Sequence, residues 1–186
     1  MPQGSPVLAA SATLNAQALR EVCGKLSISI GECFLLNLGN DRPNIYTEVC
    51  RMKSSTDFSS LQNHLPLDTP LNDMPKTIVF MNSLKTTQHA IRDLCKNHPE
   101  LAGVIDYLYA LRSKRDKKKV MKRFLSGDIK ILMATEAAGM GADIPDIQLA
   151  VQFGVPSSLS VFKQRIGRAG RDPTLKSRAV FLVEQR

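Results

Sequence analysis

The chain has 186 residues, of which 43% are hydrophobic, so it is long and apolar enough for a buried core and too apolar for a disordered segment. Its 25 lysines and arginines against 17 acidic residues give a formal net charge of +8, which favours a polyanionic partner over an ordinary basic surface. No run of about 18 apolar residues occurs, so no membrane span is expected. The 4 cysteines form no C-x-x-C pair, which predicts reduced thiols, an intracellular location and no metal site.

The first part of the chain is expected to hold a strand, a helix and a linker. Residues 6–13, which read PVLAASAT, are apolar and end in small hydroxylated side chains, which predicts a short buried strand. Residues 14–28 carry apolar side chains at helical spacing, which predicts a helix. Turn-forming residues at 40–43 then mark a boundary, so we expect domains at 1–39 and 40–186.

From about residue 44 onward, apolar strands alternate with helices. Strands are predicted at 44–52, 76–82, 103–110, 129–135, 147–156 and 177–184. Helices are predicted at 58–64, after Ser83, after Ser113 and after the serines at 157–160. This alternation predicts an α/β fold in which a parallel sheet carries helices on both faces. Ligands of such sheets bind beyond the carboxyl ends of the strands, so the segments that follow strands are candidate sites.

A glycine loop, EAAGMGADIPDI, follows the predicted strand IKILMAT. Gly139 and Gly141 allow another group to approach the backbone closely, and Pro145 stiffens the loop that carries Asp143 and Asp146. One interpretation is that a carboxylate accepts hydrogen bonds from ribose hydroxyls. The other is a turn capped by its aspartates. The loop matches neither G-x-G-x-x-G nor the phosphate-binding G-x-x-x-x-G-K-[ST] pattern.

The run FKQRIGRAGRD places Arg165, Arg168 and Arg171 at a spacing of three, with Gly167 and Gly170 at the same spacing. Arginine presents planar forked donors that suit a phosphoryl group, and the small neighbours let another surface come close. We expect this segment at the same carboxyl-end edge of the sheet as the glycine loop. The alternative is a solvated basic end of a helix.

A basic helix is predicted at SKRDKKKVMKRF, residues 113–124. Five of its basic side chains fall broadly on one side: Arg115, Lys118, Lys119, Lys122 and Arg123. Helix-borne lysines and arginines release counterions from nucleic acid, so contact with a phosphate backbone is one interpretation, with Arg115 as a candidate contact. A solvated helix face is the other.

The order of SAT, NDRPNIY, TIVFMNS, KILMATEAAGMGADIPD and QRIGRAGRD resembles the second half of superfamily 2 helicases, and above all the RecQ type of ATP-dependent 3′–5′ DNA helicase in its fungal form. The resemblance places motif III at 11–13, motif IV at 77–83, motif V at 134–146 and motif VI at 164–171. DEAD-box RNA helicases are the alternative, because they have an arginine where this chain has Arg165, whereas RecQ proteins often have Glu there.

The resemblance implies a RecA-like lobe that shares an ATP site with a first lobe, which would supply the phosphate-binding loop and hold Mg²⁺. Arg168 and Arg171 would then be the arginine fingers that stabilise charge on the γ-phosphoryl group. Gly141 and Asp143 would line the nucleotide, and Gln164 would connect nucleotide to nucleic acid.

The resemblance also implies contacts to DNA. Thr135, Asn82 and Ser83 would touch the phosphate backbone of the translocating strand. Because neither the phosphate-binding loop nor an acidic box is found in this sequence, we expect no ATP hydrolysis by the chain alone. A first RecA-like lobe in trans is the expected protein partner, and the nucleus is the expected location. A standalone nucleic-acid-binding module is the alternative from another functional class.

Overall fold

The computed structural model describes residues 6–11, 14–37, 39, 41–135 and 144–185. Contacts divide the chain into two units, Met1–Arg42 and Pro43–Arg186. In the first unit, the predicted helix is confirmed as α1 (Ala16–Leu26), followed by a short 3₁₀ helix, η1 (Ile30–Glu32). Asn15 caps α1, because its side chain accepts a hydrogen bond from the backbone N–H of Ala18 at 2.7 Å.

The predicted buried strand at the start of the chain is wrong for the residues that the structure describes. Residues 6–11 form no strand and are exposed, and Leu8 is 92% exposed. A strand needs a neighbour to pair with, and no other described residue of the first unit lies in a strand. The remaining residues of that prediction, 12 and 13, lie outside the described part of the chain.

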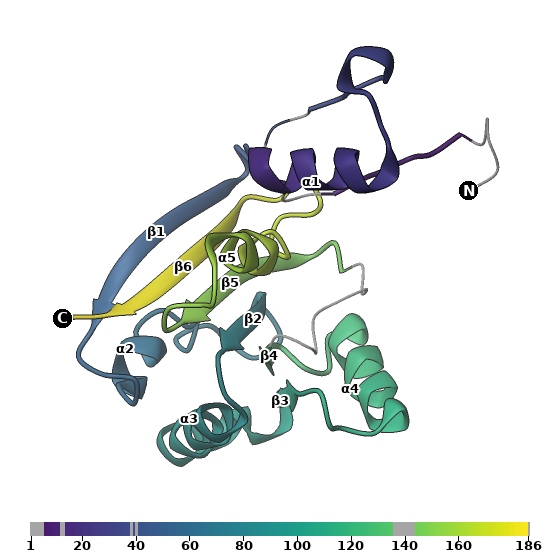
Figure 1. The fold of residues 1–186 in the computed structure, drawn as a ribbon. Helices are drawn as coiled ribbons and strands as arrows, with labels where there is room; N and C mark the ends of the chain where they lie inside the picture. Colours follow the sequence, from purple (N-terminus) through teal and green to yellow (C-terminus); the bar gives the residue numbers. More distant parts are fainter. Residues whose placement is uncertain (1–5, 12–13, 38, 40, 136–143, 186) are drawn as a thin grey trace. The chain divides into compact units, whose positions relative to one another are not determined.

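The second unit is built on a six-stranded sheet whose strands all pair in parallel, in the order β1-β6-β5-β2-β4-β3 (Figure 1). The strands are β1 (Ile45–Met52), β2 (Lys76–Met81), β3 (Ile105–Leu108), β4 (Ile131–Ala134), β5 (Ile147–Phe153) and β6 (Ser177–Glu184). The helices are α2 (Phe58–Gln62), α3 (Leu84–Asn97), the 3₁₀ helix η2 (Pro99–Gly103), α4 (Lys114–Ser126) and α5 (Leu159–Ile166). Each predicted strand and helix from residue 44 onward is therefore confirmed, with shorter ends.

Helices cover both faces of the sheet, as predicted. Along β2 the side chains alternate, and Val79 and Met81 pack into the core formed with α2 and α3. Ile78 and Phe80 point to the other face and pack into the core formed with α4. Helix α5 lies on that second face as well, because the guanidinium of Arg165 stands over the Phe80 ring. Among the described residues, no helix is long and apolar enough to cross a membrane.

Serine caps explain where three of these helices begin. The hydroxyls of Ser83, Ser113 and Ser158 each accept a hydrogen bond from the backbone N–H three residues later, at 3.0, 3.1 and 3.2 Å. Helix α4 ends at Gly127, whose φ of 85° is in the left-handed region that favours glycine. These signals are local, so the sequence alone located the starts of α3 and α4, while α5 begins at Leu159, within the predicted run of serines.

The cap of α2 generates a pH-dependent prediction. The Asp57 carboxylate accepts hydrogen bonds from the Ser59 hydroxyl at 2.6 Å, the Lys53 backbone N–H at 2.9 Å and the Ser60 hydroxyl at 2.7 Å. These bonds hold the pKa of Asp57 well below its ordinary value, with the Ser59 hydroxyl as the largest cause. Because the pKa is lowered in the folded state, the stabilisation is present at neutral pH and is lost as acid protonates the carboxylate.

We expect Asp57→Ala to lower the free energy of unfolding by about 1 kcal/mol at pH 7, the usual value for a lost helix cap. Urea unfolding at pH 7 and pH 3 measures this. The difference from the unmodified protein narrows at pH 3, because the Asp57 carboxyl of the unfolded chain is largely protonated there and folding must release that proton. Asp68→Ala, at an exposed position, is the matched control. A difference of the same size at both pH values would contradict the proposed cause.

Candidate functional site

Four residues predicted to contact nucleic acid lie at the carboxyl-end edge of the sheet. Asn82 and Ser83 follow β2, Thr135 follows β4, and Arg115 is in the first turn of α4, shortly after β3. Strands β2, β4 and β3 are neighbours, and the Thr135 backbone N–H donates to the carbonyl of Leu108 at 3.1 Å. The structure therefore brings these segments together, with Asn82, Ser83 and Arg115 exposed and Thr135 half-buried.

Arg165, the first of the three arginines whose spacing suggested a phosphoryl site, lies behind this edge as a buried guanidinium. Arg165 is 6% exposed, and its Nη1 donates to the Gln152 Oε1 at 2.7 Å and to the Asn82 Oδ1 at 3.1 Å. Its Cζ lies 5.6 Å from the centroid of the Phe80 ring, within the range of a cation–π contact. Arg165 belongs to α5, Gln152 to β5, and Asn82 follows β2, so one side chain joins three elements.

The amides that accept from Arg165 also donate to the chain. The Asn82 Nδ2 donates to the Val155 carbonyl at 2.7 Å, and the Gln152 Nε2 donates to the Gly154 carbonyl at 2.8 Å. Gly154 has a φ of 77°, and a side chain there would begin 3.4 Å from the Asn82 Nδ2. Both ends of the Asn82 amide are thus engaged. The phosphate contact predicted for Asn82 stays a prediction, and it competes with these hydrogen bonds.

The arginine segment, residues 167–172, lies at the opposite edge from the one predicted. The Gly170 backbone N–H donates to the Ile147 carbonyl at 2.9 Å, and the Gly170 carbonyl accepts from the Asn44 Nδ2 at 2.8 Å. Ile147 begins β5 and Asn44 immediately precedes β1, so Arg168 and Arg171 belong to the amino-end edge. The predicted placement at the carboxyl-end edge is therefore wrong for Arg168 and Arg171, whereas Arg165 of the same run does lie beside Asn82. The reason is that α5 connects two parallel strands and must return across the sheet before β6 begins.

Asn44 fixes the conformation of the arginine segment. Its Nδ2 donates to the carbonyls of Gly170, Asp172 and Leu175 at 2.8, 3.3 and 3.2 Å. Gly170 has a φ of 58°, and an added Cβ would lie only 2.8 Å from the Asn44 Nδ2. No other residue fits at this position without displacing the amide, so the glycine is required by both its backbone angle and its close approach.

The arginine segment also meets the end of the glycine loop. The Asp172 backbone N–H donates to the Pro145 carbonyl at 3.2 Å. Gly141 and Asp143, the predicted nucleotide contacts of that loop, lie outside the described residues. Two segments predicted to face the same nucleotide thus end side by side, while Arg168 and Arg171 are half-buried there.

The remaining predicted site residue, Gln164, is exposed on α5 directly before the buried Arg165. Because α5 has 8 residues and rises about 1.5 Å per residue, it covers roughly 12 Å of the path between the two edges. Gln164 therefore lies on the helix that connects the carboxyl-end edge to the arginine segment. The role predicted for Gln164 stays a prediction.

The family described as the helicase conserved C-terminal domain matches residues 58–173. The chain belongs to this family. It is the C-terminal domain of a superfamily 2 helicase, and the match includes the Asn82 loop, the glycine loop and the arginine segment. The family is one of ATP-dependent helicases, which act on nucleic acids.

The helicase domain is similar to proteins of several kinds. It is 31% identical over 169 residues to the bifunctional 3′–5′ exonuclease/ATP-dependent helicase WRN of Mus musculus, with 90% of this chain and 12% of that protein covered. It is 34% identical over 128 residues to DEAD-box ATP-dependent RNA helicase 21 of Oryza sativa subsp. japonica, covering 68% of this chain and 16% of that protein. The chain thus spans less than a fifth of the length of either relative.

The structure of S. cerevisiae Dbp5 bound to RNA and ADP BeF3 has the same fold, with a TM-score of 0.75 and 22% sequence identity over 95% of this chain and 44% of that one. This likeness confirms the predicted RecA-like architecture of the helicase C-terminal lobe.

We predict that Arg165→Ala destabilises the helicase domain, since it leaves the buried amide oxygen of Gln152 and the more exposed one of Asn82 without this donor. The expected loss in the free energy of unfolding is about 2–3 kcal/mol, as for buried hydrogen-bonding groups left unsatisfied. Lys163→Ala, an exposed change in the same helix, is the control and should stay within about 0.5 kcal/mol of the unmodified protein. Urea unfolding compares the two variants, and equal stabilities would refute the structural role of Arg165.

Proposed function

We propose that this chain is the C-terminal lobe of an ATP-dependent 3′–5′ DNA helicase of the RecQ type that acts in the nucleus. The observation that carries the nucleotide part is the hydrogen bond between Asp172 and Pro145 at 3.2 Å, which joins the arginine segment to the end of the glycine loop. The run NDRPN and the pair Met140-Gly141 support the RecQ type, because both are of the form found in RecQ proteins.

The arginine segment fits the phosphate end of a nucleotide. The forked guanidinium donors of Arg168 and Arg171 match phosphate oxygens, and a half-buried position strengthens their electrostatic effect. ATP supplies the phosphoryl group, and Mg²⁺ belongs to the first lobe. Arg168 and Arg171 stabilise the negative charge that develops during transfer, an effect worth about 10³–10⁵ in rate for an arginine finger.

The carboxyl-end edge suits the phosphate backbone of single-stranded DNA. Ser83 and Arg115 are exposed there, and Thr135 is close by at the end of β4. Arg115 contributes charge, while the hydroxyl groups donate hydrogen bonds to phosphate oxygens. In this proposal, closing and opening of the two lobes during ATP turnover moves the strand along this edge.

RNA is the second candidate substrate, because the chain is also similar to a DEAD-box RNA helicase and shares Arg165 with that type. A binding module without motor activity is the alternative of another class. The experiments below separate these functions.

We expect ATP hydrolysis only when a first lobe is supplied in trans, because the sequence contains no G-x-x-x-x-G-K-[ST] loop. The chain is assayed with single-stranded DNA, with and without the separately expressed first lobe of a related helicase. Arg168→Ala and Arg171→Ala should lower the rate of the mixture by about 10³-fold or more, while Lys163→Ala should leave it unchanged. ATP hydrolysis by the chain alone would contradict the prediction that it lacks a phosphate-binding loop. DNA binding without ATP hydrolysis in any mixture would favour the binding module.

The nucleic-acid edge is tested by binding of labelled oligo(dT) and oligo(U) of about 15 nucleotides over a range of salt concentrations. Arg115→Ala should weaken binding and reduce the slope of log K against log salt by about one contact. Lys96→Ala, an exposed lysine of α3, is the control. Tighter binding of oligo(dT) supports the DNA helicase, whereas tighter binding of oligo(U) supports the RNA alternative.

A further inference from the structure

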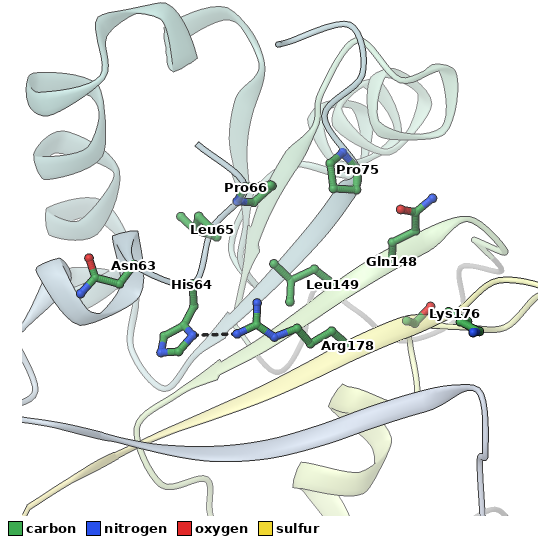
Figure 2. A pocket seen from close by; sticks show the side chains of 10 residues that line it. Asn63, His64, Leu65, Pro66, Pro75, Gln148, Leu149, Lys176 and Arg178 are labelled. Atoms are coloured by element: carbon green, nitrogen blue, oxygen red, sulfur yellow. Dashed lines mark hydrogen bonds between the residues drawn. The ribbon is translucent and has the colours of Figure 1, made fainter. Parts of the chain in front are cut away.

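A pocket of about 380 Å³ opens beside the amino ends of β5 and β6, on the face of the sheet that α2 and α3 cover (Figure 2). Its volume lies within the range of sites that hold small molecules or a few side chains, about 300–1,000 Å³. The connection between α2 and β2 forms one side, and the first residues of β5 and β6 form the other. None of the residues assigned above to nucleotide or nucleic acid lines it.

The floor of this pocket is aliphatic. Leu65 and Leu149 are 7% and 6% exposed, and the rings of Pro66 and Pro75 stand beside them (Figure 2). An apolar side chain of a ligand that enters the pocket would leave water on contact with these groups. Complete burial of a leucine-sized side chain contributes about 1.5–3 kcal/mol.

Positive charge lies at the rim. Lys176 is exposed just before β6, and the side chain of Arg178 is 45% exposed. In the sheet register, Arg178 is flanked by Leu149 of β5 and by Tyr46 of β1, so all three side chains point to the same face. Tyr46 is 68% exposed, so an apolar surface continues past Arg178 toward the edge strand.

Neighbouring side chains hold Arg178 in place. Its Nε donates to Glu48, and its Nη2 lies 3.1 Å from the Nδ1 of His64. Because the guanidinium can only donate, the Nδ1 of His64 accepts and the ring is neutral. Burial, together with the charge of Arg178, lowers the pKa of His64.

Glu48, Cys50 and His64 present ligand atoms within 4.8 Å of one another, as a metal site would. Arg178 donates to two of the three, however, so this cluster orients a guanidinium and does not favour a metal cation. The rim cation is thus fixed before any ligand arrives, which lowers the entropy that binding must overcome.

The chemistry of the pocket selects its ligand. The described residues that line it include no phenylalanine, tyrosine or tryptophan, and the ring of His64 is held by Arg178, so the lining offers little stacking surface to single-stranded nucleic acid. An aliphatic floor beside two cations suits a carboxylate next to an apolar side chain. We propose that this pocket binds a short acidic peptide segment of a partner protein, with an aliphatic side chain on Leu65 and Leu149 and a carboxylate between Lys176 and Arg178.

The test measures fluorescence anisotropy of a labelled probe peptide, Glu-Asp-Leu-Glu-Leu-Asp, with the full chain. A second probe has serine at both leucine positions. The leucine probe should bind at least about tenfold more tightly than the serine probe, because its leucine side chains bury apolar surface against Leu65 and Leu149. Lys176→Glu should lower the affinity for the leucine probe by about tenfold. Lys96→Glu, an equal change in net charge at another exposed site, should change this affinity by less than about twofold.

Amide chemical-shift mapping with the same probe provides a second measurement on the unmodified protein, and Gln148, Lys176 and Arg178 should shift most. Equal binding of the two probes, or equal effects of the two lysine variants, would overturn the proposal. Displacement of the peptide by oligo(dT), together with loss of oligo(dT) binding in Lys176→Glu, would overturn it in favour of a nucleic-acid surface. The result is independent of ATP turnover, so failure of the helicase proposal leaves this one intact.

Discussion

The hydrogen bonds of Arg165 fix the relative positions of three elements on which both predicted binding regions depend. Side chains of a helix point back toward its amino end, so Arg165, although near the end of α5, reaches the Asn82 and Gln152 amides at 3.1 and 2.7 Å. The next residues of the chain form the arginine segment at the other edge of the sheet. One buried group therefore links the loop beside the nucleic-acid edge to the helix that leads into Arg168 and Arg171.

The parallel sheet divides the chemistry between its two edges. Strands that all run the same way require each connection to return across the sheet, so a helix that begins at the carboxyl-end edge ends near the amino-end edge. The serine-capped starts of α3 and α4 accordingly lie beside the predicted DNA contacts. The end of α5 lies with Asn44 and Ile147, beside the last residues of the glycine loop. In the proposed helicase, α5 and the turns that flank it connect the nucleic-acid contacts at one edge to the phosphate contacts at the other.

The sequence predicted the strands and helices of the sheet because their signals are local, such as the apolar run of β2 and the serine before α3. The edge at which the arginine segment lies was predicted incorrectly, since it depends on the return path of α5. The hydrogen bonds of Arg165 join residues 83 and 13 positions apart, and no pattern marks them. The pocket near Arg178 was missed for the same reason, since its lining comes from four separate segments of the chain. The prediction at residues 6–11 failed because apolar composition alone does not provide a strand to pair with.

The position of Arg165 also bears on the choice between DNA and RNA. The residue is 6% exposed and donates to amides of the protein itself, so it does not present its charge to a nucleic acid. A glutamate here, as in RecQ proteins, accepts hydrogen bonds, so both amides would have to flip and present their NH2 groups to it. This flip would break their hydrogen bonds to Val155 and Gly154. The arginine is thus matched to Asn82 and Gln152 as a packing unit. The arginine that this chain shares with the DEAD-box type therefore belongs to the packing of the lobe. In the proposed helicase, exposed residues such as Ser83 and Arg115 would decide the substrate preference.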